Sequence, residues 1–367
     1  MRIVAAFFVL ITANAHALEA ADTRRFIFVG DANEPVIDVI DIYDEERVLR
    51  IETAHPVDDL ASTPYAPILV FTNIERRLIS IYDLRNEKLV REVQVDVVPR
   101  HMVLDTTGSR IAITDSVDGG FVLFSPFTAD VLFVLPNLPP TSDVLFDPNE
   151  IDIYYTNDAS GSLGIIDTNQ QSFGEIELAD ESGQALSSPS RSLDGRYVYV
   201  ANETTGEVYS LNAFSKVIYR TFEIGSSPSR PYTTPEGVFL YMSDARSGRF
   251  VAVDQNRFEV QNDVNVGTGI DLVTVGRFDR MNLLASSRSR NYVFYDNLDR
   301  RIVGRGRFEH TPIDSLGSAD GQTAFVAFRD SPQIAVVDLE ELEVSYIAAG
   351  ITGAGAFSVG LSNNVCH

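Results

Sequence analysis

The sequence predicts an all-β fold, a β-propeller with eight four-stranded blades. Short runs of β-branched and aromatic residues alternate with turns rich in Gly, Asn, Asp and Ser along almost the whole chain, which is typical of strands joined by tight turns. The pattern also repeats at intervals of 40 to 46 residues, with units whose second run begins at Phe26, Ile68, Ile111, Ile151, Tyr197, Val238, Asn282 and Ala324. Four strands at this period are typical of propeller blades.

The clearest unit lies at residues 191–215. A turn, Leu193-Asp194-Gly195, precedes the alternating run 197–200, and a polar turn at 202–206 leads into the run 207–211. No stretch of the chain sustains an apolar period of 3.6 residues, so we expect almost no helix.

The ends of the chain predict how the ring closes. An inner run precedes every unit except the first, and an eighth inner run appears after the last unit, at 355–361. We therefore expect the C-terminal strand to complete the first blade, which removes an open sheet edge. Seven blades with one degenerate hairpin are the alternative.

The first 17 residues have the features of a secretory signal. Arg2 is followed by an apolar run at 3–13, and Ala15-His16-Ala17 fits the A-x-A cleavage rule. An N-terminal strand or buried helix is the alternative. We expect a signal peptide at 1–17, one propeller domain at 18–361, a tail at 362–367 and a periplasmic or secreted location. No later run is long and apolar enough to span a membrane.

Charge and cysteine content narrow the classes of partner. The chain has 29 basic and 52 acidic residues and a net charge of −23, which opposes binding to nucleic acid or anionic lipid. It suits a periplasmic protein partner with a basic surface. A single cysteine excludes an intramolecular disulfide, so burial must stabilise the fold. The G-x-S-x-G, P-loop and H-E-x-x-H motifs are all absent from the sequence.

Three junctions resemble the YVTN family of secreted and periplasmic β-propeller repeats. They read YVAN at 199–202, YYTN at 154–157 and VFTN at 70–73, and runs ending in Asp, such as GIID at 164–167, belong to the same pattern. The resemblance implies a propeller and export. Members of this family serve as ligand-binding scaffolds, surface proteins, and accessory or catalytic subunits of periplasmic redox systems. The count of eight blades is also similar to that of the haem d1 class of periplasmic propellers, which keeps histidines at the channel mouth.

The loops before the inner strands should converge on the central channel, and they carry the candidate metal ligands. His55, His101 and His310 each lie near a proline in such a loop, with Asp58, Asp59 and Asp314 close by in sequence. Neutral imidazoles with a carboxylate suit zinc or copper, and a histidine could instead ligate haem or act as a general base. The alternative is that each histidine caps its own loop.

Further candidates lie in the same loops and at the C-terminus. Arg100, Arg230 and Asp271 are predicted to bind a ligand, since an arginine can hold a carboxylate or phosphate through two hydrogen bonds. Their alternative is an ion pair with a neighbouring aspartate such as Asp143. Cys366 and His367 form a second candidate site for copper or zinc, and a frayed tail is its alternative.

The sequence thus predicts an exported propeller that binds a metal or a small ligand at the channel mouth and acts as an accessory or binding protein. Two alternatives remain open. One is a periplasmic oxidoreductase or a haem- or metal-handling enzyme that uses the same loops. The other is a non-catalytic interaction scaffold.

Overall fold

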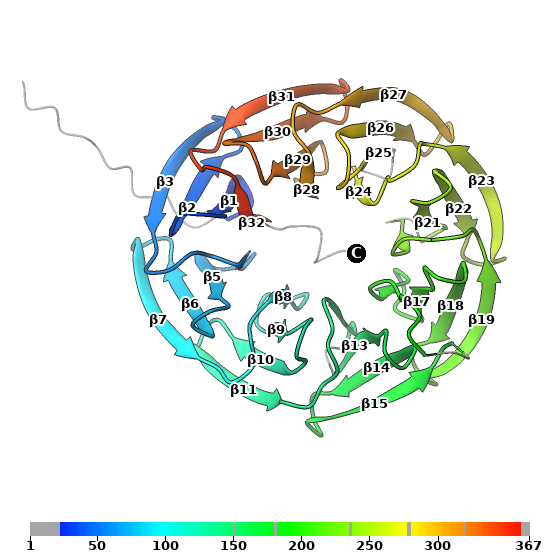
Figure 1. Ribbon diagram of the computed structural model, residues 1–367, viewed down its shortest axis with the longest axis horizontal. Helices are drawn as coiled ribbons and strands as arrows, with labels where there is room; N and C mark the ends of the chain where they lie inside the picture. The colour runs from blue at the N-terminus through cyan, green and yellow to red at the C-terminus, as the bar shows by residue number, and fades with distance from the viewer. Residues whose placement is uncertain are drawn as a thin grey trace, which may run out of the picture.

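The protein is an eight-bladed β-propeller. The computed structural model describes residues 23–149, 151–179, 182–234, 237–276, 280–318 and 320–360. In these residues eight four-stranded antiparallel sheets follow one another around a ring (Figure 1). The prediction of an all-β fold with eight blades is confirmed, and the seven-blade alternative is wrong.

Each blade holds four strands that run outward from the centre of the ring. Blade 1 joins the two ends of the chain and comprises β32 (Ala354–Val359), β1 (Phe26–Asp31), β2 (Val36–Asp41) and β3 (Glu46–Glu52). Blades 2, 3 and 4 comprise β4 (Asp59–Ser62), β5 (Ile68–Asn73), β6 (Leu78–Asp83) and β7 (Lys88–Gln94); β8 (His101–Leu104), β9 (Ile111–Thr114), β10 (Phe121–Ser125) and β11 (Asp130–Leu135); and β12 (Val144–Phe146), β13 (Asp152–Asn157), β14 (Ser162–Asp167) and β15 (Ser172–Glu177).

The other half of the ring repeats this plan. Blades 5 and 6 comprise β16 (Ser190–Arg191), β17 (Tyr197–Ala201), β18 (Glu207–Asn212) and β19 (Val217–Glu223); and β20 (Tyr232–Thr233), β21 (Phe239–Asp244), β22 (Arg249–Asp254) and β23 (Glu259–Asn265). Blades 7 and 8 comprise β24 (Leu272–Val275), β25 (Met281–Ala285), β26 (Asn291–Asp296) and β27 (Arg301–Arg307); and β28 (Pro312–Gly317), β29 (Thr323–Phe328), β30 (Gln333–Asp338) and β31 (Glu343–Ala348). The one helix among the described residues is a 3-10 turn, η1 (Thr23–Arg25), and no described helix is long and apolar enough to cross a membrane.

The hydrophobic core lies between neighbouring blades. Phe28 and Ile37 of blade 1, for example, share a buried cluster with Leu69 and Phe71 of blade 2. The second and third strands of a blade are buried on both faces, as in β1 and β2, whereas the outermost strands such as β7 are largely exposed. A fully buried side chain of this size contributes about 1.5–3 kcal/mol, so the interfaces between blades supply most of the stability.

Aspartates at the ends of the third strands shape the turns that follow. The Asp83 carboxylate accepts the N–H groups of Arg85 and Asn86 at 2.9 and 3.1 Å, and Asp338 accepts those of Glu340 and Glu341 at 2.8 Å each. An aspartate that bonds to the backbone two and three residues ahead stabilises such a turn. The repeated Asp of the sequence is therefore a structural residue.

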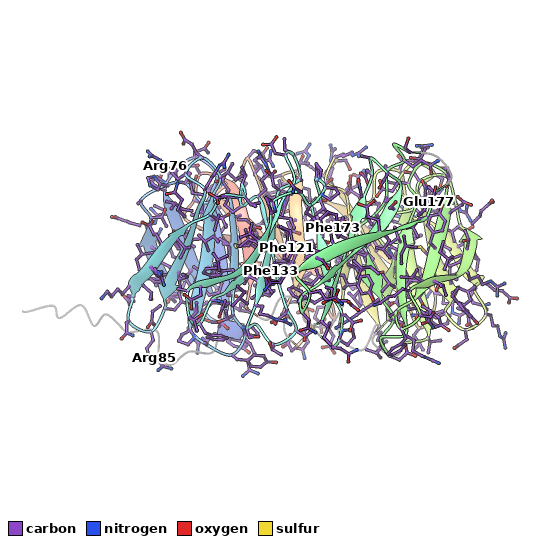
Figure 2. The ribbon with its side chains drawn as sticks, turned by 90° about the horizontal axis from the view of Figure 1, so that it is seen from below. Arg76, Arg85, Phe121, Phe133, Phe173 and Glu177 are labelled. Carbon is purple, nitrogen blue, oxygen red and sulfur yellow. The ribbon has the colours of Figure 1, made fainter. Side chains whose placement is uncertain are left out.

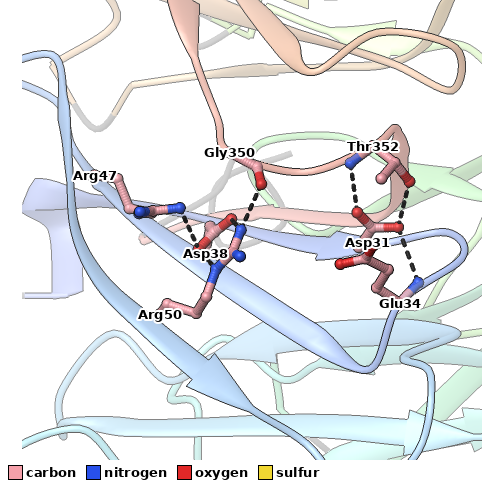
Figure 3. A network of polar contacts seen from close by, with 7 residues as sticks. All are labelled: Asp31, Glu34, Asp38, Arg47, Arg50, Gly350 and Thr352. Atoms are coloured by element: carbon pink, nitrogen blue, oxygen red, sulfur yellow. Dashed lines mark hydrogen bonds and ion pairs between the residues drawn. The ribbon is translucent and has the colours of Figure 1, made fainter.

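The first blade is joined by the predicted pairing of the chain ends. Its strand order is β3-β2-β1-β32, so the C-terminal strand is its innermost strand. Side chains reinforce this junction (Figure 3): the buried Asp31 accepts the Thr352 hydroxyl at 2.8 Å, and Arg50 donates to Asp38 at 2.8 and 2.6 Å and to the Gly350 carbonyl. These contacts link blade 1 to the segment that leads into β32.

The ring is a disc with two distinct faces. Arg76, in the turn between β5 and β6, and Arg85, in the turn between β6 and β7, are on opposite faces (Figure 2). The loops before the inner strands lie on the Arg76 face, because Asp58, just before β4, accepts the N–H of Ile74 in the same turn as Arg76. The predicted channel loops therefore share one face.

Candidate functional site

Five charged or titratable residues occupy the same position in five blades. Each lies four residues ahead of the backbone N–H that closes the turn into its second strand, at Thr63, Asp105, Asp147, Thr234 and Ser318. The five residues are Asp59, His101, Asp143, Arg230 and Asp314. They begin or closely precede the innermost strands, which brings side chains from distant parts of the sequence to the centre of the ring (Figure 1).

Two adjoining cavities lie among these inner strands. One, of about 180 Å³, is lined by Asp59, His101 and Asp143, and the other, of about 170 Å³, by Ser190, Tyr232 and Asp314. Arg191 and Arg230 line both cavities and so mark the place where they meet. We call these two cavities the channel site.

Arg230 spans part of the channel site to reach an acid two blades away. One of its guanidinium amino groups donates to Asp143 Oδ2 at 2.9 Å, and both side chains are about a quarter exposed, at 29% and 24%. Arg191, on the blade between them, donates to the backbone carbonyl of Phe146 at 3.3 Å. A guanidinium carries five N–H donors, so the pair with Asp143 leaves Arg230 able to bind a further acceptor.

Asp59 and Asp314 supply two carboxyl groups whose titration is shifted upward. Burial, with the nearby charges of Asp314 and Asp58, raises the pKa of Asp59 to about 7, although N–H groups of Met102 and Leu60 donate to it. Burial raises the pKa of Asp314 to about 6 against the opposing effect of the Ser315 N–H. Both carboxyls can therefore hold a proton close to neutral pH.

Of the three histidines predicted to share a site, His101 lines the channel site. Its Nε2 lies 2.9 Å from Ser116 Oγ, and burial lowers its pKa while Asp143 acts in the opposite direction. His310 Nδ1 lies 3.8 Å from Asp330 Oδ1, and the His55 carbonyl accepts the Thr53 hydroxyl at 2.7 Å.

Within the described residues, no group of three or more His, Cys, Asp and Glu side chains is placed to hold a metal. Metal binding by His55, His101, His310, Asp58 and Asp314 stays a prediction. The second candidate site, Cys366 and His367, lies outside the described residues.

Three of the predicted site residues hold turns of their own blades. Asp58 Oδ2 accepts the Ile74 N–H at 2.7 Å, and Asp271 accepts the N–H and hydroxyl of Ser287 at 2.7 and 2.5 Å. Arg100 donates to Asp115 at 2.7 Å, at the end of β9. The ion-pair alternative thus describes the contacts of both Arg100 and Arg230, and only Arg230 lines the channel site.

Sequence reasoning missed Ser190, Arg191 and Tyr232. The loop before β16 has no histidine or acid, so that blade was judged unsuited to a site, yet Ser190 and Arg191 of β16 line the cavities. A signal was available in Arg191 and Ser190 themselves, since polar residues stand there at inner-strand positions where other blades carry apolar ones.

The fold and the channel site define an eight-bladed β-propeller with a polar central site. No family model and no curated protein matches the sequence. Solved structures are similar in fold. Dihydro-heme d1 dehydrogenase NirN in complex with DHE aligns with a TM-score of 0.76 and 14% identity over 94% of this chain and 77% of that chain.

Two further structures align less well. Hydrazine synthase of Kuenenia stuttgartiensis aligns with a TM-score of 0.58 and 13% identity over 80% of this chain and 95% of that chain. The β-propeller domain of Cps50 (Swd1) of Myceliophteria thermophila aligns with a TM-score of 0.57 and 10% identity over 80% and 96% of the respective chains. At these identities the similarities establish the fold alone.

Proposed function

We propose that this protein is an exported binding protein, periplasmic or secreted, that holds a small polar ligand in the channel site. The observation that carries the proposal is the meeting of two cavities at Arg191 and Arg230, with Asp59, His101 and Asp314 in their walls. Concave sites in which several polar groups converge are the usual binding sites of proteins. A ligand there would contact several blades at once.

Arg230 gives the test of this proposal. We expect Arg230→Gln to weaken binding of the ligand about tenfold or more, because a hydrogen bond from a charged group contributes about 1.5–3 kcal/mol. The measurement is calorimetric titration of the mature chain with a panel of small carboxylates, inorganic phosphate, sugars, amines, and zinc and copper salts. Arg249→Gln is the matched control, since Arg249 also pairs with an aspartate, Asp263, but on the outer part of blade 6. Equal affinities in both variants would refute the channel site.

Haem handling is a second candidate function. It is favoured by the fold similarity to dihydro-heme d1 dehydrogenase NirN over 94% of the chain, together with a histidine in the channel site. Imidazole is a common axial ligand of haem iron. Titration with haemin should then give a Soret shift that His101→Ala removes and His310→Ala leaves unchanged. Identical spectra for wild type and His101→Ala would count against this candidate.

A further inference from the structure

We propose that the ligand of the channel site is a small carboxylate and that it binds together with one proton, which resides on Asp314. This inference rests on the proposed function and specifies its ligand class and its pH dependence. It is carried by three features of the second cavity: a hydroxyl without a partner, an arginine with capacity for a further bond, and a buried acid beside them.

Ser190 provides the hydroxyl. Its side chain is 4% exposed and lines the second cavity, and its oxygen has no hydrogen-bond partner among the described residues. A buried hydroxyl without a partner is costly and uncommon in proteins, and an absent ligand is one of its ordinary explanations. The hydroxyl can donate to a ligand oxygen.

Arg230 and Asp143 favour a carboxylate over a more highly charged oxyanion. Arg230 lines the same cavity as Ser190 and carries a positive charge, of which its single partner Asp143 satisfies one amino group. Guanidinium groups bind carboxylates through paired hydrogen bonds. A phosphate dianion would bring a second negative charge among Asp59, Asp143 and Asp314, whereas a carboxylate brings one.

Asp314 would repel even a carboxylate unless it is protonated. Several titratable or charged groups surround it from the neighbouring elements: Asp58 and Asp59 of the β4 segment, His101 of β8, Asp143 before β12, Arg191 of β16, Arg230 and Tyr232 of the β20 segment, and Asp271 before β24. Protonation turns the Asp314 carboxyl into a donor that can bond to the ligand. Burial raises the pKa of Asp314 to about 6, so that protonation requires little free energy near neutral pH.

The test is calorimetric titration of the mature chain with acetate, glycolate and succinate across the range from about pH 5 to about pH 8. Uptake of one proton predicts that the affinity falls up to about tenfold per pH unit above the pKa of the acceptor. Titrations in two buffers of different ionisation enthalpy should report about one proton taken up per carboxylate bound. Asp314→Asn should make the affinity independent of pH over this range.

Ser190→Ala separates a ligand contact from a structural role. We expect carboxylate affinity to fall about 5–10-fold, while the melting temperature of the unliganded protein stays the same or rises, because an unsatisfied hydroxyl is removed. Ser210→Ala is the matched control: Ser210 is also a buried serine whose hydroxyl has no partner, but it lies in β18, away from the cavity. Its melting temperature should respond in the same way with no change in affinity.

The outcomes distinguish this inference from the proposed function. Carboxylate binding that strengthens with rising pH, or without proton uptake, overturns the inference. If sugars, amines or metal ions bind and lose affinity in Arg230→Gln while the carboxylates do not bind, the inference is wrong and the proposed function stands. If Arg230→Gln and Arg249→Gln bind every member of the panel alike, or if nothing binds, both are wrong.

Discussion

Replacing Asp31 by asparagine should loosen the junction between the two ends of the chain. The Asp31 carboxylate is fully buried at the end of β1. It accepts the Thr352 N–H at 2.5 Å, the Thr352 hydroxyl at 2.8 Å and the N–H groups of Asn33 and Glu34 at 2.7 and 3.0 Å. Asparagine keeps one acceptor oxygen and turns an amide donor toward another donor. Loss of a charged hydrogen bond and of a satisfied buried N–H together amount to about 3 kcal/mol.

The pH dependence of this effect has a defined sign. Burial alone would raise the pKa of Asp31, but the hydrogen bonds from Thr352, Asn33 and Glu34 lower it below its ordinary value. A carboxylate with a lowered pKa in the folded state stabilises the protein above its pKa in the unfolded chain, and this stabilisation is lost as the pH falls through the folded value. The difference in unfolding free energy between wild type and Asp31→Asn should therefore shrink under acid conditions.

Urea unfolding and amide hydrogen exchange of β32 provide the assay. Asp244→Asn is the control, because the buried Asp244 ends the equivalent strand of blade 6 and accepts the N–H groups of Ser226, Arg246 and Ser247 at 2.8, 3.1 and 3.0 Å. In that blade the four strands are consecutive in sequence. Both variants should lower stability, but only Asp31→Asn should speed exchange at 354–359. Equal exchange of β32 in the two variants would refute the assignment of Asp31 to ring closure.

Two further predictions concern the channel and the packing of blade 4. Asp314→Asn should stabilise the unliganded protein by about 1–2 kcal/mol near pH 8 and by little near pH 4, because a pKa raised to about 6 by burial makes the ionised aspartate costly in the folded state as the pH rises. Urea unfolding at both pH values checks this, and an equal effect at both would contradict it. Gly164→Ala should cost about 1–3 kcal/mol, since the added Cβ would lie 1.9 Å from Cζ of the buried Tyr155. Gly174→Ala, in the next strand of that blade, has nothing within 4 Å of its Cβ and should change the unfolding free energy by no more than about 0.5 kcal/mol.

The fold was predictable because a propeller repeats one physical solution eight times. Each blade needs two strands buried on both faces and a turn shaped by an aspartate or asparagine, and both demands leave readable signals in the sequence. The closure by β32 followed from counting inner strands, because every inner strand but the first precedes its own blade. What the sequence did not contain was the pairing of side chains across the ring, such as Arg230 with Asp143, because those residues lie in different blades.

The candidate site was predictable in its location but only partly in its membership. Proximity of the loops was right in kind, since Arg230, His101 and Asp314 line the cavities. The sequence could not distinguish a residue that faces the channel from one that turns back to its own blade. Asp58 and Asp59 are neighbours in sequence, yet Asp58 accepts the N–H of Ile74 in its own blade and Asp59 faces the channel site. That choice depends on the alternation of side chains at the start of each inner strand.

The first residues of the inner strands argue that the channel site is more than a consequence of the fold. Blades 7 and 1 carry Leu272 and Ala356 at the position that Asp59 and Asp314 occupy, so the architecture accepts an apolar side chain there. Burying a carboxyl group without a cation is unfavourable, and the hydrogen bonds that Asp59 and Asp314 receive come from backbone N–H groups. Asp143, by contrast, is compensated by Arg230. Two uncompensated carboxyls beside an unsatisfied serine hydroxyl are a cost to the unliganded protein that a bound ligand would relieve, which is why we assign the binding function to this position in the ring.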